Sequence, residues 1–108
     1  MLGLAGLSDV DARNASAELG FLLEPGFWGQ GYATEAAAAV VSYGFECLEL
    51  NRIYARHLVS NPASGRVLTK LGMRQEGLLR GSVRKEKGVE DAVLTALLRE
   101  EWAELSQE

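Results

Sequence analysis

The sequence predicts one α/β domain, because segments with the pattern of strands alternate with segments with the pattern of helices along 108 residues. A chain of that length suits a single domain and leaves no room for a second one. Apolar residues make up 47% of the chain and charged residues 24%, which is typical of globular proteins and argues against disorder. The predicted order is strand, strand, helix, strand, helix, strand, strand, packed in two or three layers.

The hydrophobic pattern predicts the elements of the first half. Residues 2–7 are predicted as a short strand and residues 8–16 as a polar turn. Residues 17–23 are apolar on both faces after Glu18, so we expect this strand to lie inside the sheet. Apolar residues at helical spacing then predict a helix that begins at position 32 or 33 and ends near position 48.

The second half of the chain continues this alternation. Its predicted elements are a strand at 53–59, a helix at 64–71, a strand pair at 73–84 and 90–98, and a short acidic helix around Trp102. Gly72 suits the C-terminus of the second helix, and Lys87-Gly88 suits the turn between the paired strands. The unit of strand, helix and strand at 17–59 implies a right-handed crossover between two neighbouring strands.

Charge is segregated along the chain. Residues 1–51 carry seven acids and one base, residues 52–87 nine bases and two acids, and residues 88–108 six acids and one base. Two interpretations stay open: a local anion site in the basic middle, or ion pairs between the middle and the ends. The sequence does not favour a nucleic-acid partner, because aromatic side chains for stacking on bases are not regularly spaced.

The sequence also argues against several other classes of protein. Cys47 is the single cysteine, which excludes an internal disulfide and a cysteine-based zinc site, and we expect it to be a small buried side chain. No metal site is predicted. No apolar run reaches the ~18 residues of a membrane span, and the apolar start at 1–7 lacks the positive flank of a signal peptide. A cytoplasmic protein is the default expectation.

The segment W-G-Q-G-Y-A-T-E at positions 28–35 lies between a predicted strand and the first predicted helix. Its two glycines allow a tight turn and a close approach of ligand to backbone, and the helix supplies unpaired N–H groups. These features favour a cradle for phosphate or pyrophosphate. The P-loop triplet Gly-Lys-Ser/Thr is missing, and Thr34 replaces the third glycine of the dinucleotide fingerprint. A glycine-rich turn without a ligand is the alternative.

Two segments together resemble the GNAT superfamily of N-acetyltransferases, and most closely its ribosomal-protein (RimJ/RimL-like) branch. Residues 28–36 resemble the acetyl-coenzyme A (acetyl-CoA) loop, and N-P-A-S-G-R-V-L-T-K-L-G-M at positions 61–73 resembles the second cofactor segment. Gly31 and Ala33 match the end of the family pattern Gln/Arg-x-x-Gly-x-Gly/Ala, whereas Trp28 replaces its first residue. The resemblance implies a mixed, mostly antiparallel sheet flanked by helices, in one acetyl-CoA-binding domain over the whole chain.

The resemblance also implies how acetyl-CoA is held. Backbone N–H groups of the loop bind the pyrophosphate, and a strand edge that splays from its neighbour pairs with the pantetheine amides. The cofactor-binding residues implied in this way are Phe21, Leu22, Leu23, Trp28, Gly29, Gln30, Gly31, Tyr32, Ala33, Thr34, Asn61, Ser64 and Arg66. Asn61 orients the pantetheine arm, and Arg66, one helical turn before Lys70, faces the 3′-phosphate. The alternatives are an ordinary central strand, an Asn-Pro turn and a solvated helix face.

Two residues are candidates for catalysis. Glu18 is an acid in an otherwise apolar strand, where burial would suit it as a general base; the alternative is an ion pair with an arginine of the basic middle. Ser64 matches the serine proposed in this branch to protonate the leaving thiolate, and the alternative is an N-cap of the second helix.

The expected function is transfer of an acetyl group from acetyl-CoA to a primary amine by direct attack of the amine. The acceptor is a protein N-terminus or a small molecule. Family members begin with a strand and helices before the segment at 2–7, so the domain is expected to be N-terminally truncated, with an open sheet edge and an uncovered apolar face. We therefore expect a homodimer. The alternative function is a catalytically incompetent module that binds acetyl-CoA or a partner chain.

Overall fold

The computed structural model describes residues 5–21 and 30–105. The elements are β1 (Ala5–Asp11), β2 (Ser16–Phe21), α1 (Gln30–Glu46), β3 (Arg52–Leu58), α2 (Pro62–Lys70), β4 (Arg74–Lys85), β5 (Gly88–Leu98) and α3 (Arg99–Leu105). The described strands form one sheet in the order β1-β2-β3-β5-β4. Only β2 and β3 pair in parallel there, and the other neighbours are antiparallel. The mixed, mostly antiparallel sheet and the interior position of β2 are confirmed.

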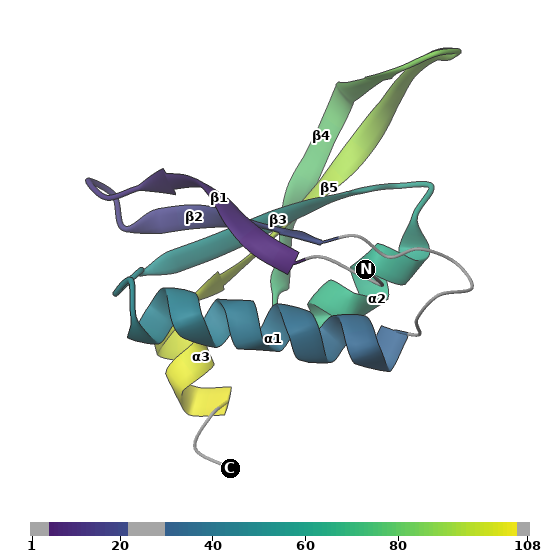
Figure 1. Ribbon diagram of the computed structural model, residues 1–108. Helices are drawn as coiled ribbons and strands as arrows, with labels where there is room; N and C mark the ends of the chain where they lie inside the picture. The colour runs from purple at the N-terminus through teal and green to yellow at the C-terminus, as the bar shows by residue number, and fades with distance from the viewer. Residues whose placement is uncertain (1–4, 22–29, 106–108) are drawn as a thin grey trace.

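The three helices of the described chain lie on one face of the sheet, which makes two layers (Figure 1). The largest fully buried side chains between the layers are Phe45, Ile53, Val67, Leu68 and Leu97. Phe45 of α1 stacks on Trp102 of α3 with ring centroids 5.2 Å apart, so aromatic packing joins the first helix to the last. Ala33 and Ala37 are fully buried, and their small side chains let α1 lie close to the sheet.

The clearest difference from the predicted elements is in β1. The sequence predicts a polar turn at 8–16, whereas the strand continues to Asp11 and the turn covers only residues 12–15. Polar side chains are tolerated there because β1 is an edge strand with most of residues 8–11 exposed to solvent. Asp9 has φ 49°, and the pairing with β2 shifts register between Ser8 and Asp11. The other described boundaries lie within three residues of the prediction.

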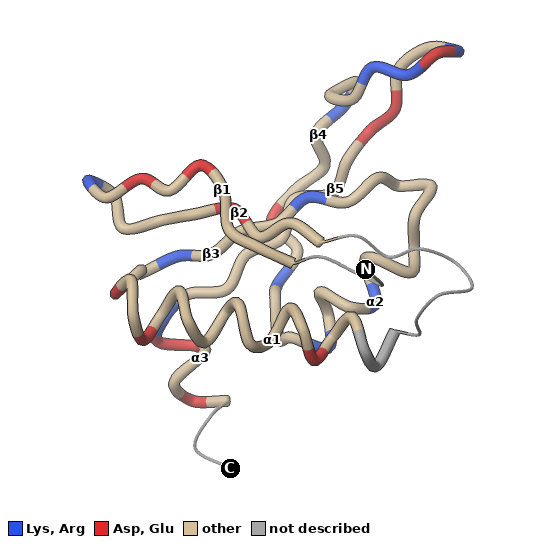
Figure 2. Tube along the Cα trace, in the orientation of Figure 1, with Lys and Arg blue, Asp and Glu red and all other residues tan. Residues whose placement is uncertain are grey.

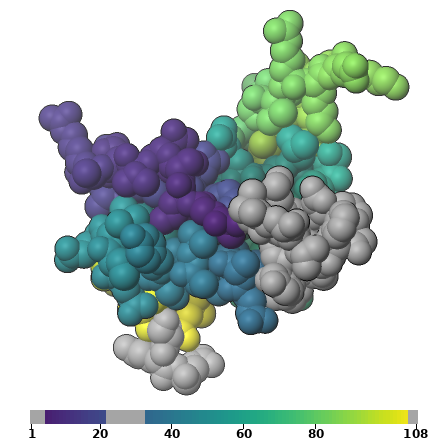
Figure 3. All heavy atoms as spheres, in the orientation of Figure 1, coloured from purple at the N-terminus to yellow at the C-terminus, as the bar shows by residue number. Residues whose placement is uncertain are grey.

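The hairpin of β4 and β5 extends beyond the rest of the sheet (Figures 1 and 3). β3 pairs with β5 only over residues 92–98 of β5. Beyond this point β4 and β5 pair only with each other as far as their turn. That turn is Glu86-Lys87, one residue earlier than predicted, because Gly88 already pairs with Lys85. We call residues 80–91 the arm.

Glu90 ties the arm to the loop that precedes α2. Its carboxylate accepts a hydrogen bond from the Ser60 N–H at 2.7 Å and lies 2.8 Å from Lys85 Nζ. Lys85, and then Ser60, lower the pKa of Glu90 to about 2. In a second contact within the arm, Asp91 accepts a hydrogen bond from the Gly81 N–H at 2.7 Å. The base of the arm is therefore fixed by charge-assisted hydrogen bonds.

An apolar hollow of about 410 Å³ lies between β1 and α1. Its lining residues are Gly6, Leu7, Val10, Ala39, Val40, Tyr43 and Leu48. The large apolar side chains Val10, Tyr43 and Leu48 in this lining are exposed. Figure 3 shows β1 lying against α1 on this side of the molecule. Among the described strands β1 is at the edge of the sheet, and this hollow lies beside it, whereas the predicted truncation of the domain stays a prediction.

The charge segregation is used for ion pairs within the fold. Arg56 pairs with Glu18, Arg74 with Glu101, and Lys85 with Glu90, so each of these pairs joins the basic middle to an acidic end. Figure 2 shows basic positions on β3, α2 and the arm. Of the two interpretations of the charge pattern, pairing between the segments is thus observed.

The exposure of Cys47 and the lengths of the described helices bear on two expectations from the sequence. Cys47 is exposed, so the prediction of a buried side chain is wrong: it follows the last residue of α1, where the chain has already left the core. No helix in the described part of the chain is long and apolar enough to cross a membrane.

Candidate functional site

The parallel pairing of β2 with β3 is short. Residues 16–18 pair with residues 52–54, and the ladder then stops. Residues 19–21 of β2 continue beside β1 alone, and residues 55–58 of β3 continue beside β5 alone. Within the described chain, the edge of residues 19–21 that faces β3 therefore has no strand partner. We call the space between these two segments the opening.

Two helices begin at the end of the sheet where the opening lies. β2 and β3 are parallel, so their carboxyl ends are on the same side; α1 starts beyond β2, and α2 starts beyond β3 (Figure 1). The first N–H groups of a helix lack acceptors within that helix, and the dipole makes this end positive. A free strand edge and two such helix ends are features that suit an extended ligand carrying phosphate.

The structure describes only part of the predicted cofactor loop. Leu22, Leu23, Trp28 and Gly29 lie outside the described residues. Residues 30–32 form the start of α1, so Gly31 lies inside its first turn, whereas the sequence predicts a later start. Two loop residues lie farther along the helix: Ala33 is fully buried, and Thr34 is half-buried. Phe21 ends β2 and packs against the core.

Glu18 and Arg56 meet across the opening. Glu18 is the last residue of β2 that pairs with β3, and Arg56 lies two residues beyond the end of the ladder. Arg56 Nε donates to Glu18 Oε2 at 2.6 Å and Nη2 donates to Oε1 at 3.0 Å. These hydrogen bonds to Glu18 raise the pKa of the Arg56 guanidinium. The structure thus shows that Glu18 forms an ion pair with an arginine of the basic middle, one of the two alternatives that the sequence left open. The role of Glu18 as a general base stays a prediction.

Asn61, and not Ser64, caps α2. Asn61 Oδ1 accepts a hydrogen bond from the Ser64 N–H at 3.2 Å, and Pro62 occupies the first turn. The interpretation of Ser64 as an N-cap is therefore wrong, because the helix begins two residues earlier than predicted. The Asn-Pro pair is a helix start, and the predicted roles of Asn61 and Ser64 toward a ligand stay predictions.

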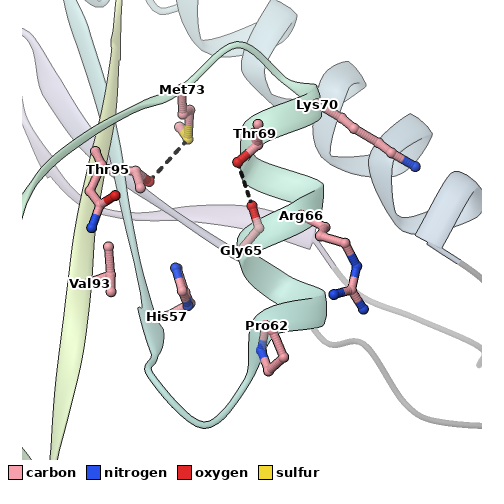
Figure 4. Close-up of a pocket in the computed structure, with 10 residues that line it drawn as sticks. His57, Pro62, Gly65, Arg66, Thr69, Lys70, Met73, Val93 and Thr95 are labelled. Carbon is pink, nitrogen blue, oxygen red and sulfur yellow. Dashed lines mark hydrogen bonds between the residues drawn. The ribbon is translucent and has the colours of Figure 1, made fainter.

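Arg66 and Lys70 lie on the outer side of α2. A hollow of about 470 Å³ lies beside α2, with Arg66 and Lys70 among its lining residues, and Figure 4 shows these two side chains extending away from Val93 and Thr95 on the far wall. His57 fills the gap beneath the helix: a Cβ on Gly65 would lie 3.0 Å from its ring. Both Arg66 and Lys70 are exposed, as a solvated face or a phosphate contact requires.

Sequence reasoning missed Arg56 as a residue of the site. The signal was the alternation in β3: Ala55 is buried in the core, so Arg56 must point to the opposite face, the face that also carries Glu18. No group of three or more His, Cys, Asp or Glu residues in the described chain is placed to hold a metal ion.

Comparison with known proteins identifies the family. The profile of the acetyltransferase (GNAT) domain matches residues 1–74. The uncharacterized N-acetyltransferase p20 of Bacillus licheniformis is 36% identical over 103 residues, which are 95% of this chain and 58% of that protein. The putative ribosomal N-acetyltransferase YdaF of Bacillus subtilis strain 168 is 33% identical over 102 residues, which are 94% of this chain and 56% of that protein.

A solved structure has the same fold. A mutant form of the spermidine N-acetyltransferase SpeG from Vibrio cholerae matches with a TM-score of 0.89 and 25% identity, over 97% of this chain and 62% of that chain. The chain belongs to the GNAT acetyltransferase domain family. It spans a little over half the length of the curated relatives it matches.

The capping arrangement predicts unequal effects of two neighbouring substitutions. Asn61→Ala should lower the free energy of unfolding by about 1 kcal/mol, because it removes the acceptor at the start of α2. Ser64→Ala should cost clearly less, because Asn61 binds the backbone N–H of this residue and not its hydroxyl. Urea unfolding of both variants measures the difference. An equal or larger loss for Ser64→Ala would contradict this assignment of the cap.

Proposed function

We propose that this chain forms the acetyl-CoA-binding part of an N-acetyltransferase, which transfers an acetyl group to a primary amine by direct attack. The observation that carries the proposal is the opening: the parallel ladder stops after residue 18, at the end of the sheet where α1 and α2 begin. Membership of the GNAT acetyltransferase domain family supports it.

The residues at the opening fit the chemistry of acetyl-CoA. The pantetheine arm carries amides, which need the donors and acceptors that a free strand edge presents, and residues 19–21 have such an edge toward β3. The pyrophosphate carries negative charge, which suits the N–H groups at the start of α1, where Gly31 lies. Asn61 follows β3, where it would meet the pantetheine chain of acetyl-CoA, and Arg66 lies on the outer face of α2, where it would meet a terminal phosphate.

The reaction needs a neutral amine and a protonated leaving group. Acetyl-CoA supplies an acyl carbon activated as a thioester. The amine nitrogen forms a bond to this carbon while the carbon–sulfur bond breaks, the nitrogen loses a proton and the thiolate gains one. We propose that Glu18, at the opening, accepts the proton directly or through water, and that the Ser64 hydroxyl, one turn into α2, hydrogen-bonds to the sulfur.

A second candidate is a module that binds acetyl-CoA without turnover. The observation that favours it is the engagement of Glu18: both of its oxygens accept hydrogen bonds from Arg56. A bidentate ion pair of this kind is a structural role for Glu18 that needs no turnover. Release of free thiol from acetyl-CoA in the presence of an amine separates the two candidates.

The acceptor and the branch of the family belong to the proposal as well. We propose a protein N-terminus or a small-molecule amine as acceptor. The name of YdaF, a putative ribosomal N-acetyltransferase, supports the RimJ/RimL-like branch and the first acceptor, whereas the spermidine N-acetyltransferase structure supports the second. We place the protein in the cytoplasm, where acetyl-CoA is formed and used.

We also propose that the chain forms a homodimer. The support is the free edge of β1 and the apolar hollow beside it, where Val10 and Tyr43 are more than half exposed. Exposed edges and apolar patches of this kind favour association.

Acetyl-CoA should raise the unfolding temperature of the chain. At 100 times the dissociation constant, a ligand of the folded state adds ~2.7 kcal/mol, which is several degrees for a domain of this size. Gly31→Val should abolish most of the shift, because a branched side chain blocks approach to the backbone. Gly77→Val on β4 is the control, since a Cβ there meets no heavy atom within 4 Å. No shift of the wild-type at millimolar acetyl-CoA would refute the site.

Two substitutions test the catalytic roles. If Glu18 is the base, Glu18→Gln should lower the turnover number by roughly 10²-fold or more, measured by thiol release. If Ser64 assists the leaving group, Ser64→Ala should lower turnover while the affinity for acetyl-CoA is unchanged. Unchanged turnover in Glu18→Gln, with lower stability, would leave Glu18 a structural partner of Arg56 only.

Sedimentation velocity tests the homodimer. The chain should sediment as a dimer at micromolar concentration. Val10→Asp, which places a charge in the apolar hollow, should shift it toward the monomer, whereas Val89→Asp, at an exposed site on the arm, should not. A wild-type monomer at micromolar concentration would contradict self-association.

A further inference from the structure

A third hollow, of about 330 Å³, lies on the face of the sheet opposite the helices. Its lining residues are Glu18, Arg56, His57, Leu58, Val83 and Ala92. Glu18 is the last paired residue of β2, and Arg56 and Leu58 belong to the diverging part of β3, so the hollow lies over the opening. A molecule in this hollow is next to the strand edge proposed for acetyl-CoA. We call it the acceptor hollow.

The charged group that the acceptor hollow presents to solvent is Arg56. The side chain of Glu18 is only 12% exposed, whereas that of Arg56 is 50% exposed. The carboxylate is thus covered and the guanidinium is accessible. The remaining wall includes Leu58, Val83 and Ala92, which are apolar.

Arg56 also retains a donor for a ligand. Its two hydrogen bonds to Glu18 use Nε and Nη2, and Nη1 has no partner within the described chain. Asp9 on β1 is the other carboxylate whose charge acts on Arg56, and its effect is weaker than that of Glu18. A guanidinium with one carboxylate already bound and one N–H₂ group directed elsewhere is suited to a second carboxylate.

We propose that the acceptor hollow selects an amine that also carries a carboxylate, and that Arg56 is the residue that selects it. This inference rests on the proposed function, because it assigns the acceptor of the same reaction. A polyamine would bring a second positive charge to an exposed guanidinium whose own counter-ion is buried. The hollow therefore discriminates by charge against a polyamine such as spermidine, which the name of the Vibrio cholerae enzyme gives as its acceptor.

Three amines with the same four-carbon chain test the proposal: 4-aminobutyrate, butylamine and 1,4-diaminobutane. Binding to the chain in the presence of coenzyme A is followed by NMR on the Nε–H resonance of Arg56, assigned by its absence in Arg56→Gln. We expect 4-aminobutyrate to bind about fivefold more tightly than butylamine, and 1,4-diaminobutane to bind more weakly than butylamine. In turnover, kcat/KM should follow the same order.

The variants make the test specific to this pair. Arg56→Gln leaves the charge of Glu18 unpaired, so this variant should prefer 1,4-diaminobutane over the other two amines. Its binding is measured by titration of backbone amide resonances, and its turnover as kcat/KM. Because an unpaired buried carboxylate destabilises the fold, the double variant Glu18→Gln/Arg56→Gln is made as well. It removes both charges and should bind the three amines within about twofold of one another.

Arg52→Gln is the matched control. Arg52 lies on the same strand and the same face as Arg56 and also binds a carboxylate through two hydrogen bonds, to Glu76 at 3.0 and 2.8 Å. It does not line the acceptor hollow. The wild-type order of the three amines should therefore persist in Arg52→Gln.

The outcomes separate this inference from the proposed function. Equal binding of the three amines to the wild-type, tighter binding of 1,4-diaminobutane, or no binding of 4-aminobutyrate at millimolar concentration overturns the inference, whether or not acetyl-CoA is bound. Failure of acetyl-CoA to bind or to release thiol overturns the proposed function. The NMR order of the amines still decides the charge selectivity of the hollow in that case.

Discussion

The early end of one parallel ladder is the constraint on which the rest of this structure depends. β2 and β3 share three registered pairs and then separate, so that each continues beside a different antiparallel neighbour. The divergence leaves a strand edge free, sets two helix starts at the same end of the sheet, and creates the hollow on the opposite face. Arg56 and Glu18 span the gap where the strands part, and their bidentate pair holds the two edges at a fixed separation.

This ion pair combines a structural and a chemical demand in one place. A carboxylate buried in a sheet needs a cation, since breaking such a pair leaves an uncompensated charge. The same carboxylate lies at the opening, where the proposed reaction needs a proton acceptor. Arg56 supplies the cation that the buried carboxylate needs. Because its side chain is exposed, it also presents a positive charge to a ligand in the hollow. Stability and substrate choice are therefore linked through one guanidinium, and a change at position 56 alters both.

The sequence predicts the succession of elements well because hydrophobic period is a local property, and it predicts the family because two motifs occur in order. It fails where distant residues decide. Arg56 is 38 residues from Glu18, so only the alternation in β3 hints at their meeting. Ser8, Asp9 and Asp11 are polar and are predicted in a turn, yet an edge strand accepts them. Asn61, and not Ser64, is the N-cap of α2, because the helix already begins at Pro62. The backbone geometry of the helix start decides this.

The contact between Glu90 and Ser60 gives the arm a mechanical connection to the site. The arm is a two-stranded lever that stands clear of the sheet, and its fixed point is the loop between β3 and α2. Two hydrogen bonds join the arm to this loop, from the Ser60 N–H to Glu90 and from the Val59 N–H to the Asp91 carbonyl, and the loop leads directly to Asn61 and the first turn of α2. Lys85 and Ser60 lower the pKa of Glu90 to about 2, so its carboxylate is charged at neutral pH when it accepts the hydrogen bond from Ser60. A partner that binds the tip of the hairpin would therefore be linked through the arm and this loop to α2, the helix proposed to hold the cofactor.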